Sequence, residues 1–195
     1  MWSFLPSVIF IASVSTVFAQ GDKDDFPLNE FRHRGGTLVC FSRSDVSKGY
    51  TPCLRIGDLA IGLRLEEIEE KIKKIGGRFV ETHLGRAGAE TRLYYLRPEK
   101  GVKDLPSLVV AYSGGRAEAI QLSGGRTEAP LAFSSIRLGD SPLQVVGLIG
   151  PAYSTEHDPG TNGTLWEYGP FPFNIEFKNG KVYSIRIRML HEGGE

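Results

Sequence analysis

The residues able to do acid–base, metal or nucleophilic chemistry are scattered along this chain. Its four histidines, His33, His83, His157 and His191, form no His-x-x-x-His pattern, which would place two metal ligands on one helix face. The sequence also contains no Gly-x-Ser-x-Gly, phosphate-loop or dinucleotide-binding motif. Residue spacing therefore gives no support for an enzyme, and we expect a non-enzymatic protein with no cofactor and no metal.

One short run, Glu156-His157-Asp158, does group ionisable side chains in a glycine-rich stretch. It is open to two interpretations. The run is either a solvated turn, or a place where His157 contacts a partner or supplies half of a metal site. An alternative function follows from the second interpretation, namely a small-ligand binder or hydrolase that uses the 153–163 loop. That function requires a concave pocket containing His157 and a second titratable group from the first half of the chain.

Residues 1–19 predict a signal peptide. The stretch is uncharged and mostly apolar, ends in Val17-Phe18-Ala19, and is followed at once by the charged run 21–25. It is too short and too mixed to span a bilayer, so we expect no transmembrane anchor. A retained anchor is the alternative, supported by the lack of Lys or Arg before the apolar residues. We therefore expect a secreted or periplasmic protein.

Cys40 and Cys53 are the two cysteines of the chain, and they flank a polar, turn-rich stretch. In an oxidising compartment the pair is expected to form a disulfide, which would contribute about 3 kcal/mol by closing a short loop. The spacing is far from the Cys-x-x-Cys of redox proteins.

Overall charge is balanced, because Lys plus Arg and Asp plus Glu both number 23. No net field attracts nucleic acid, so we expect no nucleic-acid partner. An apolar content of 41% in 195 residues is enough to build a buried core.

The chain contains two similar runs, Tyr112–Leu122 and Phe177–Ile187, which align without a gap. Each follows a glycine-marked helix entry, at Gly62 and at Gly139, and Pro142 and Gly150 bound the second helix. This self-similarity predicts an α+β fold of two tandem repeats, each a helix packed on a small antiparallel sheet. The expected units are a signal peptide (1–19), an N-terminal lead with the disulfide loop (20–53), repeat 1 (54–130) and repeat 2 (131–195).

Each similar run is expected to be a hairpin that turns on three residues, 113–115 in the first and 178–180 in the second. This loop length gathers the apolar residues of repeat 2 on one face: Phe171, Phe173, Ile175, Phe177, Tyr183, Ile185 and Ile187. The other face then carries Asn174, Glu176, Val182, Ser184, Arg186 and Arg188, and it meets either water or a partner. In repeat 1 the same construction buries Leu108, Val110, Tyr112, Ile120 and Leu122. It exposes Val109, Ala111, Ala117, Ala119 and Gln121, which either the N-terminal strand covers or a partner contacts.

Aromatic residues near position 166 have two possible roles, because Trp and Tyr fill small cores and also dominate binding hot spots. Strand alternation sends Trp166 and Tyr168 to one side and Leu165 and Glu167 to the other. The candidate partner-binding residues are Trp166, Glu167, Tyr168, Asn174, Glu176, Arg186, Arg188 and His157.

The order of helix entry, aromatic strand and glycine-turn hairpin resembles the SmpA/OmlA (BamE-like) family. The resemblance is carried by residues 138–145, the Gly150-Pro151 helix end, the strand at 165–168 and the hairpin at 177–187. The tandem arrangement is similar to that of the β-lactamase inhibitor proteins. No functional residue of either family has a matching motif here. The resemblance implies a protein-binding module, such as an inhibitor or an envelope assembly factor; a purely structural envelope protein is a further possibility.

Overall fold

A computed structural model describes residues 31–34, 37–40, 54–85, 88–159, 162–169 and 171–189. The strands in the first half of these residues are β1 (Phe31–Arg34), β2 (Thr37–Cys40), β3 (Arg55–Ile56), β4 (Leu59–Ala60), β5 (Arg78–Leu84), β6 (Glu90–Tyr95), β7 (Ser107–Ser113) and β8 (Arg116–Ser123). The strands in the second half are β9 (Ser154–Asp158), β10 (Gly163–Glu167), β11 (Phe173–Lys178) and β12 (Lys181–Arg188). The two helices are α1 (Leu65–Lys74) and α2 (Pro142–Ile149).

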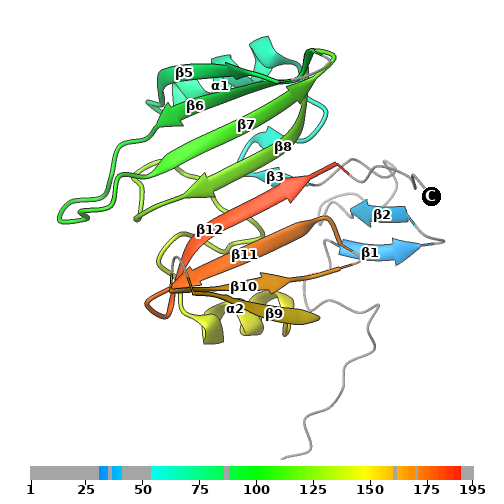
Figure 1. Ribbon diagram of the computed structural model, residues 1–195, viewed down its shortest axis with the longest axis vertical. Helices are drawn as coiled ribbons and strands as arrows, with labels where there is room; N and C mark the ends of the chain where they lie inside the picture. The colour runs from blue at the N-terminus through cyan, green and yellow to red at the C-terminus, as the bar shows by residue number, and fades with distance from the viewer. Residues whose placement is uncertain are drawn as a thin grey trace, which may run out of the picture.

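Eight of these strands form one antiparallel sheet in the order β5-β6-β7-β8-β12-β11-β10-β9 (Figure 1). The prediction of an α+β fold with two helix-on-small-sheet repeats is therefore wrong. The described chain is mostly β, its two helices are short, and a single sheet runs through both halves. The physical reason is the direct pairing of β8 with β12, which places Leu122 opposite Ile185. The predicted boundary at residue 130 falls in the connection between β8 and α2.

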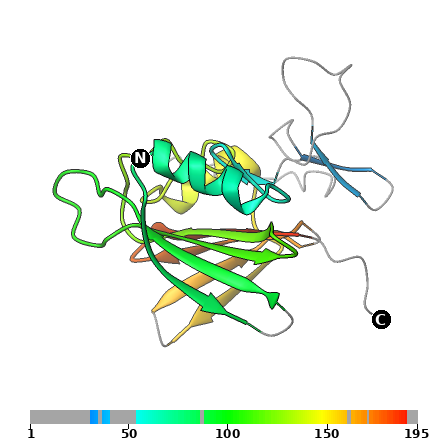
Figure 2. The same cartoon turned by 90° about the horizontal axis from the view of Figure 1, so that it is seen from above.

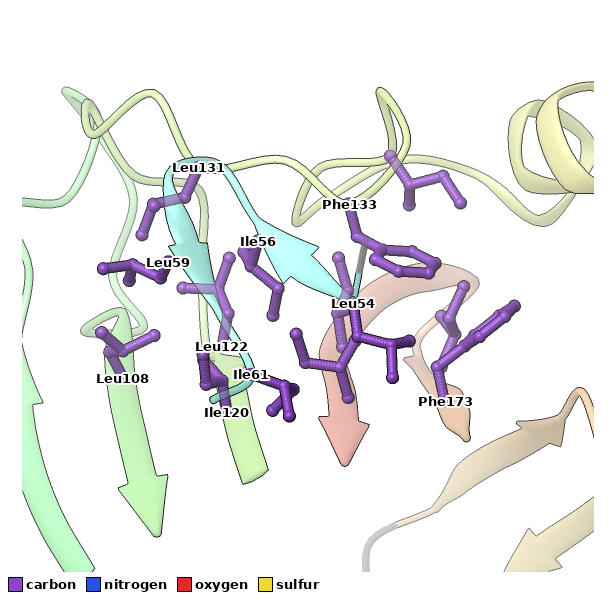
Figure 3. Packing of buried hydrophobic residues seen from close by; sticks show 14 of the residues in the cluster. Leu54, Ile56, Leu59, Ile61, Leu108, Ile120, Leu122, Leu131, Phe133 and Phe173 are labelled. Atoms are coloured by element: carbon purple, nitrogen blue, oxygen red, sulfur yellow. The ribbon is translucent and has the colours of Figure 1, made fainter. Parts of the chain in front are cut away.

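Both helices lie on the same face of the sheet, as Figure 2 shows. The short hairpin β3–β4 packs on that face as well, where it contacts β8. Its apolar side chains meet those of the sheet and of the 131–133 segment in one core (Figure 3). Backbone hydrogen bonds attach the hairpin on two sides, from Gly57 N to Ala132 O at 2.8 Å and from Gly62 N to Ala117 O at 2.8 Å. We call this covered side of the sheet the helix face.

Helix α1 begins at Leu65 and buries Ile68 and Ile72 against the sheet, as their helical spacing predicts. Its charged residues contact both their own helix and the sheet. Glu70 pairs with Lys74 at 2.7 Å in the expected i to i+4 arrangement.

Glu67 and Glu69 each have a lysine four residues later in the same helix, Lys71 and Lys73, but they form other contacts. The Glu67 carboxylate accepts a hydrogen bond from Arg64 N at 2.9 Å, and Glu69 pairs with Arg92 of β6. The ion pair to Arg92 ties the helix to the sheet.

Helix α2 confirms the start and stop signals in the sequence. Ser141 is the N-cap, and its hydroxyl oxygen accepts a hydrogen bond from Gln144 N, while Pro142 is the first helical residue. Gly150 ends the helix with a φ of 80°, a left-handed conformation that favours glycine. Such a short helix is stable only where it packs, and it buries Val145 and Ile149.

Both long hairpins turn on two residues. Asn179 and Gly180 have φ values of 52° and 67°, and Gly114 and Gly115 have values of 54° and 73°. Positive φ at both central residues is the geometry of a type I′ turn, whose twist matches that of the strands. The three-residue loops predicted for these turns are therefore wrong.

A β-bulge next to each turn nevertheless produces most of the predicted segregation of faces. In β12 the bulge lies between the pair Glu176–Ser184 and the pair Phe177–Val182. The extra residue on β12 is Tyr183. Ile185 and Ile187 thereby return to the buried side, as predicted. Tyr183 is half-buried rather than buried, and Val182, expected on the other face, is buried. Ala117, expected to be exposed, is also buried.

The N-terminal predictions fall largely outside the described residues. The signal peptide (1–19), Cys53 and His191 lie outside them, and the side chain of Cys40 is not described, so the disulfide stays a prediction. Strand β2 pairs with β1 in antiparallel orientation. Within the described residues, neither helix is long and apolar enough to cross a membrane.

Candidate functional site: the open face of the sheet

The candidate site is the sheet face opposite the helices, which we call the open face (Figure 2). Directly opposed residues of antiparallel strands share a face, so the strand register assigns every side chain to one side. A row that includes Tyr94, Leu108, Leu122, Ile185 and Ile175 belongs to the helix face, and all five are buried. The residues between them in sequence form the open face.

Two unbroken rows cross all eight strands on the open face. The first row, from β5 to β9, is Glu81, Leu93, Val109, Gln121, Arg186, Asn174, Glu167 and Ser154. The second row is Arg78, Tyr95, Ser107, Ser123, Ser184, Glu176, Leu165 and Glu156. A shorter third row holds His83, Thr91, Ala111, Ala119 and Arg188. Among the described residues, no helix or hairpin covers these rows.

The open face has an apolar half and a charged half. Leu93, Tyr95 and Val109, on β6 and β7, are half-buried by their neighbours in the sheet. The half formed by β12, β11 and β10 carries Arg186 and Glu176. A surface that joins a small apolar area to charged groups is typical of protein interfaces, whose apolar centre is bordered by polar residues.

Hydrogen bonds between side chains organise the middle of the open face. Gln121 Nε2 donates to Ser184 Oγ at 3.0 Å, and the hydroxyls of Ser107 and Ser123 lie 3.2 Å apart. These bonds link β7, β8 and β12 on the open side. They fix the polar side chains at the centre of the open face.

The charges of Arg186, Arg188 and Glu176 are available for contacts. None of the ion pairs within the described part of the chain involves these three side chains, and both arginines are exposed. By contrast, Glu167 at the polar end accepts a hydrogen bond from Ser154 Oγ at 3.2 Å. The unpaired guanidinium groups can donate bidentate hydrogen bonds to carboxylates of a partner.

Five of the eight candidate binding residues come together on the open face: Glu167, Asn174, Glu176, Arg186 and Arg188. Trp166 lies on the helix face, where its ring packs 4.4 Å from that of Phe177. His157 is exposed on the outermost strand β9, opposite Thr164, and the register places it on the side away from the open face.

Tyr168 belongs to the core. Its side chain is fully buried, its ring stacks on that of Phe173 with centroids 4.8 Å apart, and its hydroxyl donates to Gly150 O at 3.3 Å. Burial raises the pKa of the phenol. The structure therefore does not place Tyr168 with the open-face residues, and it favours the core interpretation of this aromatic pair.

The rows also contain residues that sequence reasoning did not select. Leu93, Tyr95 and Leu165 are half-buried on the open face, in the same rows as the predicted charged residues. Their alternation with buried residues was visible in the sequence. The missing information was the order of strands, which places them in the same cross-strand rows as the charged residues of β11 and β12.

Two cavities lie on the other side of the molecule. One, of about 360 Å³, is lined by Arg126, Arg137 and Asp140 among others, and the other, of about 140 Å³, by Lys71 and Lys74 among others. His157 lines neither cavity, so neither is the pocket that the alternative ligand-binding function requires. Among the described residues, no three His, Cys, Asp or Glu side chains gather as a metal site would need.

Comparisons of the chain with protein-family models, with curated proteins and with solved structures found no match. The resemblance to the SmpA/OmlA family and to the β-lactamase inhibitor proteins therefore stays a prediction.

Proposed function

We propose that this chain is a secreted or periplasmic, non-enzymatic protein-binding module that holds its partner on the open face. The observation that carries the proposal is the one-sided build of the sheet. Both helices and the β3–β4 hairpin pack on the helix face, while the two open-face rows lie outside that packing (Figure 2). A sheet face that is free of its own helices, with half-buried apolar residues on one half and a hydrogen-bonded polar centre, is suited to a partner.

The dimensions of the open face suit a protein partner. Eight strands spaced about 4.8 Å apart span about 34 Å, and three rows at two-residue steps add about 14 Å along the strands. With the side chains at the margins included, the area approaches the roughly 800 Å² that each partner contributes to a standard protein interface. A surface of this width is much broader than a small-molecule site, which is a compact cleft or cavity.

The residues of the open face indicate which groups a partner would present to it. An apolar side chain or loop would lie over Leu93 and Val109, and carboxylates would reach Arg186 and Arg188. The predicted signal peptide places this binding in an exported compartment, where an inhibitor or an envelope assembly factor would act.

Site-specific photo-cross-linking tests the proposal. A photoreactive amino acid replaces Val109 on the open face, and the matched control carries it at Leu143, an α2 residue that is 84% exposed. In the native compartment the Val109 probe should give one discrete adduct of fixed stoichiometry, and Arg186→Glu should reduce its yield. Equal adducts from both positions, or none from Val109, would refute the proposal.

A further inference from the structure

The two outermost strands of the large sheet differ sharply in composition. Strand β9 reads Ser-Thr-Glu-His-Asp, and it has no apolar residue. Polar and charged residues of this kind keep an edge strand from pairing with other chains. Strand β5, at the opposite edge in Figure 1, carries Phe79, Val80 and Leu84.

Exposed apolar side chains concentrate on β5. All seven of its residues are exposed, with 52% of Phe79, 37% of Val80 and 82% of Leu84 accessible. Half of the six large apolar side chains that are exposed within the described residues lie on this one strand. Its outward backbone groups also form no hydrogen bond with any described residue, since β5 pairs with β6 alone. An edge with unpaired backbone and apolar side chains favours strand addition.

Going beyond the proposed function, we infer that β5 is a dimerisation edge, at which a second copy of this chain adds its own β5 in antiparallel orientation. The basis for a second copy is self-complementarity. A two-fold axis perpendicular to the sheet, placed at Thr82, sets Glu81 of each copy opposite His83 of the other. The two side chains already lie on the same face, with His83 Nε2 3.0 Å from Glu81 Oε1 within one chain.

The same register also pairs the apolar residues. Leu84 of one copy falls opposite Phe79 and Val80 of the other, where a β-bulge interrupts the pairing of β5 with β6. A register centred on Glu81 would instead oppose like charges, and one centred on His83 would leave Glu81 opposite a glycine. Of these three registers, only the one centred on Thr82 pairs Glu81 with His83 and also brings the apolar side chains together.

The geometry of the dimer has a consequence for the open face. Because the axis is perpendicular to the sheet, the two sheets join into one, with both open faces on the same side. Two binding surfaces would then point toward the same target, which raises avidity for a partner presented in more than one copy.

Sedimentation velocity of the mature chain over a range of concentrations tests the inference. The expected result is a weak, concentration-dependent dimer, since an edge contact buries less area than a standard interface. Leu84→Lys should shift the equilibrium to monomer. Leu143→Lys is the matched control, because Leu143 is 84% exposed and Leu84 is 82% exposed, and it should leave the dimer unchanged.

A charge swap tests the register. His83→Glu places like charges opposite each other twice per dimer, so the dissociation constant should rise by up to roughly 30-fold. Combining it with Glu81→Lys restores opposite charges and should restore the dimer. Three results would overturn the inference. The chain could stay monomeric at all concentrations, Leu84→Lys could leave the dissociation constant unchanged, or the double variant could dimerise as weakly as His83→Glu. Open-ended assemblies that grow with concentration would also overturn it, because they would indicate pairing of β5 with β9.

Discussion

Two neighbouring residues of β12 should respond in opposite ways to truncation. Ile185 is fully buried on the helix face, between Leu122 of β8 and Ile175 of β11. Arg186 is exposed on the open face, between Gln121 and Asn174. The two side chains therefore test which face is the interior of the protein and which is available to a partner.

The magnitudes follow from burial. Ile185→Ala removes buried apolar atoms and leaves a cavity, at a cost of about 2 to 5 kcal/mol in the free energy of unfolding. Its position in a central strand leaves little room for collapse, so we expect a value of about 3 to 4 kcal/mol. Arg186→Ala removes an exposed side chain with no ion pair in the described chain, and we expect a change within about 0.5 kcal/mol.

Urea denaturation followed by tryptophan fluorescence measures both values. The sequence has two tryptophans, and Trp2 lies in the predicted signal peptide, so Trp166 is the reporter in the mature chain. Its ring packs on Phe177 in the folded state. The midpoint should fall for Ile185→Ala with the slope unchanged, and stay in place for Arg186→Ala. Comparable losses for the two variants would refute the assignment of faces.

Three further predictions concern local interactions. Tyr168→Phe should lower the free energy of unfolding by about 1 kcal/mol, because it removes a buried hydrogen bond; an unchanged urea midpoint would contradict this. Ser141→Ala should cost about 1 kcal/mol through loss of the α2 N-cap, and Ser141→Asp should recover most of it in the same assay. The hydrogen bond from Lys74 holds the pKa of Glu70 below its ordinary value of 4.5, so Lys74→Met should raise this pKa. In the unmutated chain Glu70 stabilises the fold above pH 4.5, and this contribution is lost as the pH falls through the lowered pKa; the variant should show less of it. A side-chain NMR titration would detect the shift, and an unaltered Glu70 curve would argue against the pair.

Local structure was largely readable from the sequence. The helical spacing of Ile68 and Ile72, and the Ser-Pro start and glycine end of α2, predict the two helices closely. The turns were located correctly at Gly115 and Gly180, although their length was not. Two turn geometries bring the same residues, farther along the strands, to one face: a two-residue turn followed by a bulge, and a three-residue turn. The alternation of apolar and polar residues therefore could not distinguish the two geometries.

The order of the strands in the sheet could not be predicted from the sequence. The pairing of β8 with β12 joins Gln121 to Arg186, residues far apart in the chain, and no local pattern indicates such a contact. Self-similarity instead suggested two separate small sheets. The same missing contact hid the role of Leu93 and Tyr95, which belong to the open face only because β6 and β7 continue the sheet that contains Arg186.

Oxidative footprinting with and without the partner captured through Val109 tests the central claim most directly. In the free chain, Tyr95 and Leu165 of the open face should be modified, while Tyr94 and Leu108, which are buried, should be protected. Adding the partner should protect Tyr95 and Leu165 and leave the exposed Leu143 of α2 reactive. Open-face residues that are unreactive in the free chain, or equally reactive with the partner bound, would contradict the account.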